Sequence, residues 1–220
     1  MMKNTFKKLI THYNEKGLFN TFSLVAKNLL KRAVSIFYKG IDFDIWTLDL
    51  GKVEDSPMNF GNEYGCRHLQ MEDLPEIQKR FGELTAKDFE TRLKNAKCYI
   101  IFNKEGIIGY SWSSENRVEK QGDAPFYFNV EPKEGMIYLY GDFIIPSKRG
   151  RGANKRLMQY RLAECKKARL KRGFGLIERR NLPQIRTVKN SGQETGGRLT
   201  YRRYLCFVRK NTSILRDFCK

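Results

Sequence analysis

The sequence predicts one α+β domain preceded by a helical extension. From about residue 64 to residue 208, short strand patterns alternate with amphipathic helical patterns. Of the 220 residues, 40% are hydrophobic and 13% are aromatic, which is enough for one packed core. The first forty residues differ from the rest, and the regular series of strands and helices begins only after residue 50. We therefore divide the chain into an extension (residues 1–50) and a domain (residues 51–220).

The charge of the chain points to anionic partners. Lys and Arg number 42 against 24 Asp and Glu, a net charge of +18. Such a charge attracts nucleic acid, anionic lipid or phosphorylated ligands. No RRM, KH or zinc-finger pattern is present, so nucleic acid is the least favoured of these partners.

The five cysteines and two histidines do not have the spacing of metal ligands, and we expect no metal site. An odd number of cysteines without a secretory signal is typical of reduced thiols in the cytoplasm. No apolar run approaches the roughly 20 residues of a membrane span. The sequence therefore predicts a cytoplasmic protein.

The extension contains a basic amphipathic segment, residues 18–38. Its apolar residues recur at helical spacing, and Lys27 and Lys31 fall on the opposite face. Three roles remain open: a helix packed on the domain, a helix on an anionic membrane surface, or a helix that binds a partner. The apolar residues are Leu18, Phe22, Val25, Leu29, Ala33 and Ile36.

The next elements follow from local patterns. Residues 42–50 alternate like a strand, and residues 51–61, with Pro57, predict a loop. Further along, strands are expected at 64–70 and, as a pair around a turn, at 97–114. Helices are expected at 71–81, with Asp73 as cap and Pro75 in the first turn, and at 85–96.

The second half of the chain follows a polar excursion at residues 115–135. A long central strand is predicted at 136–146 and a helix at 154–172. A further strand (173–178), a short helix (182–192) and a last strand (199–208) complete the predicted elements.

The segment "PSKRGRGANKRL", residues 146–157, joins the long strand to the helix. Its glycines allow backbone N–H groups to approach an anion, and the helix start adds its positive dipole end. Arg149 and Arg151 add charge. The segment matches neither the Walker pattern nor G-x-G-x-x-G. We interpret it as a loop that binds a pyrophosphate.

These motifs resemble those of the GCN5-related N-acetyltransferase (GNAT) family. That family has Arg/Gln-x-x-Gly-x-Gly/Ala after a strand ending in V-x-P. Here Ile144-x-Pro146 precedes Arg149-x-x-Gly152-x-Asn154. The family's next motif, V-x-x-x-N before a short helix, is matched by residues 177–181. The resemblance covers residues 64–208. It implies a mixed, mostly antiparallel central sheet flanked by helices, and an acetyl-CoA-dependent N-acetyltransferase.

The resemblance also implies which residues bind acetyl-CoA. Backbone groups of Ile144 and Ile145 would pair with the pantetheine arm, and one N–H there would polarise the thioester carbonyl. Asn181 would contact the arm from the neighbouring strand. The pyrophosphate would be bound by the loop residues Arg149, Gly150, Arg151, Gly152, Ala153 and Asn154.

Asp142 is the first candidate for the general base, because it lies on the central strand just before the loop. By alternation it shares a face with Tyr138 and Tyr140, and a carboxylate between aromatic rings can have a raised pKa. Its structural alternative is an Asp bonded to an N–H group or to an arginine. Glu178 is the second candidate, with an ion pair to a neighbouring Arg as its alternative.

The general acid is harder to place, because Val188 stands where the family often has a tyrosine. Tyr201 and Tyr204 are candidates by residue type only, with a place in the core as the alternative. His68, Cys165 and Cys206 are interpreted as structural.

Basic runs at residues 179–186 and 202–210 are either a solvated face or a site for an anionic acceptor. An amino sugar linked to a nucleotide or a lipid fits the second interpretation. This suggests an enzyme of cell-surface polysaccharide synthesis at the inner face of the membrane. The alternative function is a non-catalytic basic module that binds RNA or an anionic membrane, which the charge and the departures at Asn154 and Val188 favour. The sequence does not determine the acceptor, the acyl chain or the oligomeric state.

Overall fold

A computed structural model describes residues 38–53, 63–118, 129–204 and 207–220. The chain divides into two units, and the larger comprises residues 42–200 and 211–220. The amphipathic segment 18–38 lies outside the described residues except for its last residue. Residues 42–49 belong to the larger unit.

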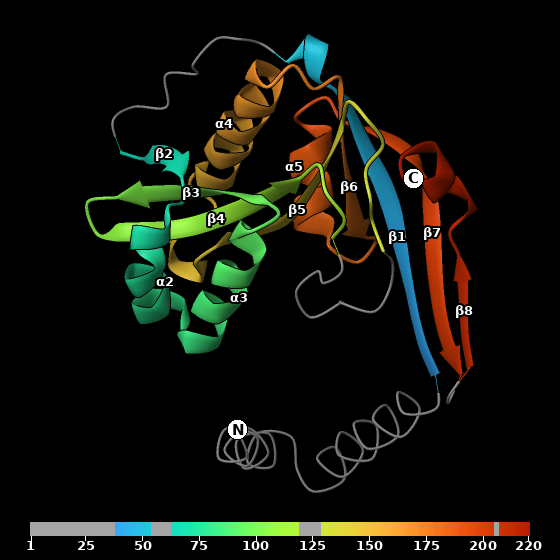
Figure 1. Ribbon diagram of the computed structural model, residues 1–220, viewed down its shortest axis with the longest axis horizontal. Coiled ribbons are helices and arrows are strands. Elements are labelled where there is room, and N and C mark those ends of the chain that lie inside the picture. Colours follow the sequence, from blue (N-terminus) through green and yellow to red (C-terminus); the bar gives the residue numbers. More distant parts are fainter. Residues whose placement is uncertain (1–37, 54–62, 119–128, 205–206) are drawn as a thin grey trace, which may run out of the picture. The chain divides into compact units, whose positions relative to one another are not determined.

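The larger unit is built on a mixed sheet with the strand order β2-β3-β4-β5-β6-β1-β7 (Figure 1). The β5–β6 pair is parallel, and the pairs β2–β3, β3–β4, β4–β5 and β1–β6 are antiparallel. The predicted mixed, mostly antiparallel sheet is therefore confirmed. The strands are β1 (Tyr38–Asp49), β2 (Gly65–His68), β3 (Lys97–Asn103), β4 (Gly106–Ser114), β5 (Met136–Ile144), β6 (Arg172–Glu178) and β7 (Glu194–Tyr204).

Helices flank the sheet, as predicted. They are α2 (Leu74–Phe81), α3 (Glu83–Leu93), α4 (Ala153–Lys167) and α5 (Leu182–Lys189). Short 3-10 turns are present at Leu50–Lys52, Met71–Asp73, Pro146–Lys148 and Ser213–Asp217. Among the described residues, no helix combines the length and apolar character that crossing a membrane requires.

In the smaller unit, the described residues are 38–41, 201–204 and 207–210. They form the outer ends of β1 and β7 and most of β8 (Phe207–Asn211). The Arg202 side chain donates hydrogen bonds to the carbonyl oxygens of Ile41 and Tyr201. The residues of β8 are exposed.

Strand β1 lies within the sheet rather than at its edge. It pairs with β6 from Phe43↔Glu178 to Asp49↔Arg172. Consecutive buried residues such as Ile45 and Trp46 show that both of its faces are covered. The strand itself was predicted, but its position was not, because alternation does not identify a pairing partner.

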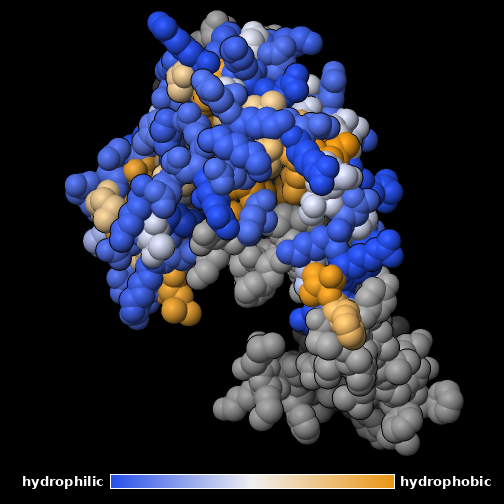
Figure 2. Space-filling model, turned by 45° about the vertical axis from the view of Figure 1, so that its right-hand side comes forward, coloured by the Kyte–Doolittle hydropathy of each residue, from blue (hydrophilic) through white to orange (hydrophobic). Residues whose placement is uncertain are grey.

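The two faces of the sheet carry different helices. Met158 of α4 packs against Leu139 of β5, and Val188 of α5 packs against Ile177 of β6. On the other face, Phe89 of α3 makes edge contacts with aromatic rings of β4. The surface visible in Figure 2 is mostly hydrophilic where the residues are described.

The last predicted strand is longer than expected and is followed by a second one. The structure has β7 from Glu194 and β8 from Phe207 in place of one strand at 199–208. The start of β7 was missed because it contains two glycines, at positions 196 and 197, and glycine has a low propensity for strands. A Cβ at Gly196 would lie 2.9 Å from Thr47 and Phe218 side-chain atoms. Close tertiary packing therefore favours glycine within this strand.

Candidate active site

A bulge interrupts β5 next to the candidate base. Between the pairs Tyr110↔Phe143 and Trp112↔Tyr140, β5 has one residue more than β4. Gly141 lies in this stretch with φ of 65°, and a Cβ there would be 2.9 Å from Cδ1 of the Trp112 ring. Only glycine fits such a position without strain. Because a bulge locally disrupts the ladder, main-chain polar groups here become available to a ligand.

The bulge turns Asp142 to the face opposite the predicted one. Strict alternation places Asp142 with Tyr138 and Tyr140, but an extra residue reverses the alternation beyond it. Asp142 instead contacts Arg161 of α4. The predicted shared face is therefore wrong, and the carboxylate points toward α4.

Strands β5 and β6 separate after a short paired stretch. Their parallel pairing ends at Tyr138↔Phe174, whereas β5 continues to Ile144 and β6 to Glu178. Beyond the separation, β5 remains paired with β4 and β6 with β1. The sheet therefore opens between the carboxyl ends of β5 and β6.

A groove of about 560 Å³ lies at this opening. Its lining includes the predicted residues Asp142, Ile144, Arg149, Gly150, Gly152, Ala153, Asn154 and Asn181. A larger hollow of about 1130 Å³ adjoins it along α4 and shares Lys155, Asn190 and Ser191 with it. We take the smaller groove as the candidate site, because it contains both the loop glycines and Asp142.

The loop before α4 leaves open space at two glycines. Gly150 and Gly152 have φ of 76° and 80°, and apart from chain neighbours no heavy atom would lie within 4 Å of a Cβ at either position. Gly152 is also the N-cap of α4, and no side chain caps this helix end. First-turn N–H groups and the positive dipole end therefore lie beside an open space that suits a phosphate.

The other residues of the loop, from 148 to 153, differ in their contacts. The Lys148 ammonium lies 2.7 Å from Oε1 of Glu105. Nε of Arg149 donates to the Ile144 carbonyl oxygen at 2.9 Å, and its guanidinium lies over the Phe143 ring. Arg149 thus closes the loop onto the end of β5. Arg151 is exposed, whereas Ala153 is buried at the start of α4.

The main chain at the end of β5 is already partly engaged. The Ile145 N–H donates to the Ile108 carbonyl oxygen at 3.0 Å, and the Ile144 carbonyl accepts from Arg149. In this arrangement the Ile145 N–H does not serve a ligand. The bulge at Gly141 is therefore the better candidate for an N–H group that could polarise a carbonyl.

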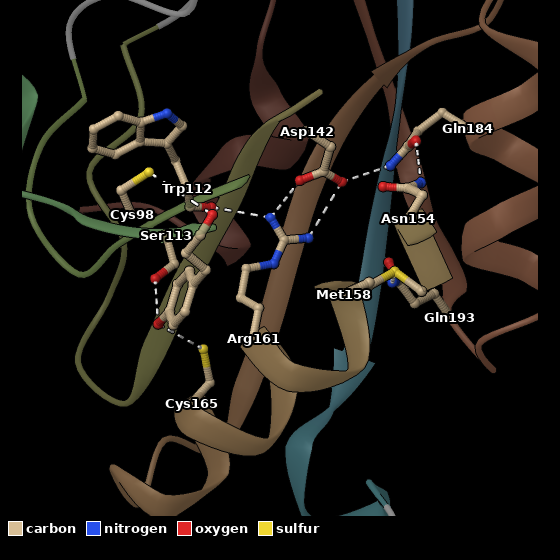
Figure 3. Close-up of polar contacts among 11 residues, drawn as sticks. Cys98, Trp112, Ser113, Asp142, Asn154, Met158, Arg161, Cys165, Gln184 and Gln193 are labelled. Atoms are coloured by element: carbon tan, nitrogen blue, oxygen red, sulfur yellow. Dashed lines mark hydrogen bonds and ion pairs between the residues drawn. The ribbon is translucent and has the colours of Figure 1, made fainter. Parts of the chain in front are cut away.

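Asp142 is held by side chains from two helices (Figure 3). The Arg161 guanidinium donates to both carboxylate oxygens, from Nη1 to Oδ1 at 2.6 Å and from Nη2 to Oδ2 at 3.4 Å. Nε2 of Gln184 donates to Oδ2 at 2.8 Å. Nη1 of Arg161 also donates to the Trp112 carbonyl oxygen at 3.1 Å. The arginine contact named as the structural alternative is present, and the role of Asp142 as base stays a prediction.

Two asparagines complete the network. Nδ2 of Asn154 lies 3.4 Å from Oε1 of Gln184. Oδ1 of Asn181 accepts from the Gln184 main-chain N–H at 3.3 Å and so caps α5. Asn154 therefore makes a side-chain contact that Gly or Ala could not make, and Asn181 positions the helix that carries Gln184.

The other catalytic candidates are Glu178, Tyr201 and Tyr204. Glu178 is the half-buried last residue of β6, and its carbonyl oxygen accepts from the Asn181 N–H at 2.8 Å. It is not among the described residues that line the groove. Tyr201 is a buried residue of the smaller unit. Nothing is described of the Tyr204 side chain, so its role stays a prediction.

Sequence reasoning missed Arg161 and Gln184. Arg161 is only 2% exposed. The signal was its position four residues after Leu157 and four before Cys165, on the apolar face of α4. Gln184 offered no comparable signal, because a polar residue in the first turn of a helix is ordinarily solvated.

His68 and the cysteines in the described part of the chain are not in the groove lining, and Cys206 lies outside the described residues. Burial raises the pKa of the Cys66 thiol to about 11, and burial also raises the pKa of Cys165. Nε2 of His68 lies 3.2 Å from Oε2 of Glu164, and its ring lies against Tyr99. Across the described part of the chain, no three His, Cys, Asp or Glu side chains gather as metal ligands would.

No protein-family model matches the sequence, and no curated protein matches it significantly. Solved structures do. A GCN5-related N-acetyltransferase from Sphaerobacter thermophilus matches with TM-score 0.55 and 11% identity over 81% of this chain. A GCN5-related N-acetyltransferase-like protein from Streptococcus suis matches with TM-score 0.53 and 12% identity, also over 81%. A GNAT-family protein from Novosphingobium aromaticivorans matches with TM-score 0.53 and 17% identity over 79%.

This chain spans 56%, 67% and 66% of the length of those three chains, respectively. At such low identity the likeness concerns the fold alone. The opening of the sheet beside the glycine-rich loop and the start of α4 is consistent with this likeness in fold. The chain therefore has the fold of the GCN5-related N-acetyltransferases.

Proposed function

We propose that this protein is an acetyl-CoA-dependent N-acetyltransferase that transfers an acetyl group to an amine by direct attack. One observation carries the proposal: a single groove contains the opening between β5 and β6, the uncapped start of α4 behind two open glycines, and the Asp142 carboxylate. Because one fold can host many activities, this site rather than the fold supports the activity.

The residues of the groove fit such a cofactor. Main-chain N–H groups of residues 149–154 would bind the pyrophosphate, together with the start of α4. The carboxyl end of β5 and Asn181 would border the pantetheine arm. When bound, acetyl-CoA supplies a thioester whose acetyl carbon bonds to the amine nitrogen as its bond to sulfur breaks.

Asp142 would remove a proton from the acceptor ammonium, directly or through a water molecule. Main-chain N–H groups at the Gly141 bulge would stabilise the negative charge that develops on the carbonyl oxygen. The proton for the leaving sulfur has no assigned donor, because Val188 is buried where the family resemblance places a tyrosine. Asp142→Asn should lower turnover at neutral pH more than it weakens cofactor binding. Full turnover in that variant would place the base elsewhere.

The acceptor in this proposal is an amino sugar linked to a nucleotide or a lipid, in cell-surface polysaccharide synthesis. The net charge of +18 supports an anionic acceptor. We place the enzyme in the cytoplasm, with residues 18–38 on the inner face of the membrane. Sedimentation of the full chain with phosphatidylglycerol vesicles, but not with phosphatidylcholine vesicles, is the expected result. If the chain sediments with neither kind of vesicle, the membrane assignment is wrong.

Calorimetry at moderate salt tests the activity at its first step. Acetyl-CoA should bind the native chain, and Gly152→Asp should abolish binding by placing a carboxylate in the open space. Gly152→Ala is the matched control: it introduces the same backbone strain without the charge and should retain binding. Unchanged affinity in Gly152→Asp would remove the loop assignment. Salt-sensitive binding of tRNA without any cofactor binding would favour a basic binding module instead.

A further inference from the structure

Gln184 connects three walls of the groove. It lies in the first turn of α5, and its amide NH₂ donates to Oδ2 of Asp142 on β5 at 2.8 Å. Its amide oxygen lies 3.4 Å from Nδ2 of Asn154 at the start of α4. Figure 3 shows this side chain between the carboxylate and the asparagine. One neutral side chain therefore joins β5, α4 and α5.

These contacts cross the opening in the sheet. The β5–β6 pairing ends at Tyr138↔Phe174, and Asp142 lies four residues further along β5. The hydrogen bond from Gln184 to Asp142 replaces the missing strand contact at this level. An extended arm that runs beside β5 needs the space that a neighbouring strand would fill, about 4.8 Å from the backbone. The arm and the Gln184 side chain therefore compete for the same place.

We propose that Gln184 is a latch across the cofactor groove, and that the pantetheine arm displaces it. Displacement removes the shorter of the two contacts to Oδ2 of Asp142 and leaves only the 3.4 Å contact from Nη2 of Arg161, whose Nη1 stays on Oδ1. The carboxylate thus becomes accessible to an acceptor amine only when the cofactor is present. This inference rests on the proposed function and makes Gln184 a positioning residue for the base.

The two partners of Asp142 differ in how easily they can leave. Arg161 is charged and 2% exposed, and its Nη1 also donates to the Trp112 carbonyl oxygen. Charged hydrogen bonds are the stronger class, and a buried guanidinium that leaves its carboxylate becomes an uncompensated charge. Gln184 is neutral and half-buried, so its amide can exchange these contacts for water. Release at Oδ2 is therefore the easier change.

The latch also gives Asn154 a role. Gly or Ala, which is usual at this position in the family that the sequence resembles, has no side-chain amide that could contact a residue at the position of Gln184. Here the amide contributes a second, longer contact to the same latch. Removing it should loosen the latch without opening the contact to Asp142.

A closed latch lowers the apparent affinity for the cofactor, because only the open fraction of the protein binds. Calorimetric titration of the full chain with free CoA tests this prediction. Gln184→Ala should bind CoA about tenfold more tightly than the native chain. Asn154→Ala should shift the affinity in the same direction by a smaller factor. Gln78→Ala, which removes an exposed amide from α2 outside the groove lining, is the control and should leave the affinity unchanged.

A second titration uses the adenosine bisphosphate part of CoA, which lacks the pantetheine arm. The latch predicts no gain for this probe in any variant. Weaker CoA binding by Gln184→Ala would overturn the latch and show that Gln184 contacts the cofactor. Unchanged binding would also overturn it and show that Gln184 has no role in cofactor binding. If Gln184→Ala does not fold, no gain in Asn154→Ala overturns it. Absence of CoA binding to the native chain would defeat the proposed function itself, a result distinct from failure of the latch alone.

Discussion

Arg161 of α4 and Asp142 of β5 form an ion pair, with Nη1 2.6 Å from Oδ1 and side-chain exposures of 3% and 12%. A pair buried to this degree is weak evidence of net stabilisation, because each charge loses its hydration. Removal of one partner is a different matter, since it leaves an uncompensated charge. The pair therefore defines the geometry of the groove more than the stability of the fold.

Arg161→Met should lower the free energy of unfolding by about 3 kcal/mol. The double variant Arg161→Met, Asp142→Asn should lose less than the sum of the two single variants, by at least about 1 kcal/mol. Urea unfolding measures all three. Lys167→Met, which removes an exposed ion pair from the same helix, is the control and should change little. Additive losses would mean that the two side chains do not act as a pair.

Gly141→Ala should destabilise the protein more than Gly135→Ala. Both glycines have positive φ, 65° and 75°, so both substitutions introduce backbone strain. Only at position 141 would the new Cβ meet an atom at 2.9 Å, Cδ1 of Trp112, whereas at Gly135 the nearest atom lies at 3.7 Å. The extra loss should be about 1–3 kcal/mol, measured by urea unfolding. Equal losses would show that the bulge relaxes freely around the added methyl group.

The ion pair of Asp73 with Arg67 should make stability depend on pH. The hydrogen bonds from Arg67 lower the pKa of Asp73, with a further contribution from the Gln70 N–H. The native state therefore stabilises the ionised form of the Asp73 carboxyl group more than the unfolded state does. This contribution is complete above the ordinary Asp value of about 3.9 and is lost as the pH falls through the lower native value.

Asp73→Asn should therefore destabilise the protein at pH 7, and the difference from the native chain should shrink below about pH 4. Urea unfolding at several pH values measures this difference. Asp217→Asn, an exposed carboxylate near the C-terminus, controls for the change in charge. A difference that stays constant down to about pH 2 would argue that Asp73 acts through its shape rather than its charge.

Much of the fold was predictable from local pattern. The alternating runs at residues 42–50 and 97–114 and the helical pattern after Gly152 give elements that the structure contains. The loop glycines were also readable from the sequence alone, because the positive φ that they adopt favours that residue type. These features depend on neighbours within a few positions, and such information is present in the chain itself.

The orientation of Asp142 and its partners was decided by the tertiary structure. One extra residue at Gly141 exchanges the faces of β5, and alternation cannot reveal it because the bulge depends on pairing with β4. Arg161 and Gln184 reach Asp142 from helices 19 and 42 positions further along the chain. The insertion of β1 beside β6 likewise follows from packing. The sequence by itself thus determined the elements and the glycine-rich loop, whereas contacts between distant segments decided which groups meet in the groove.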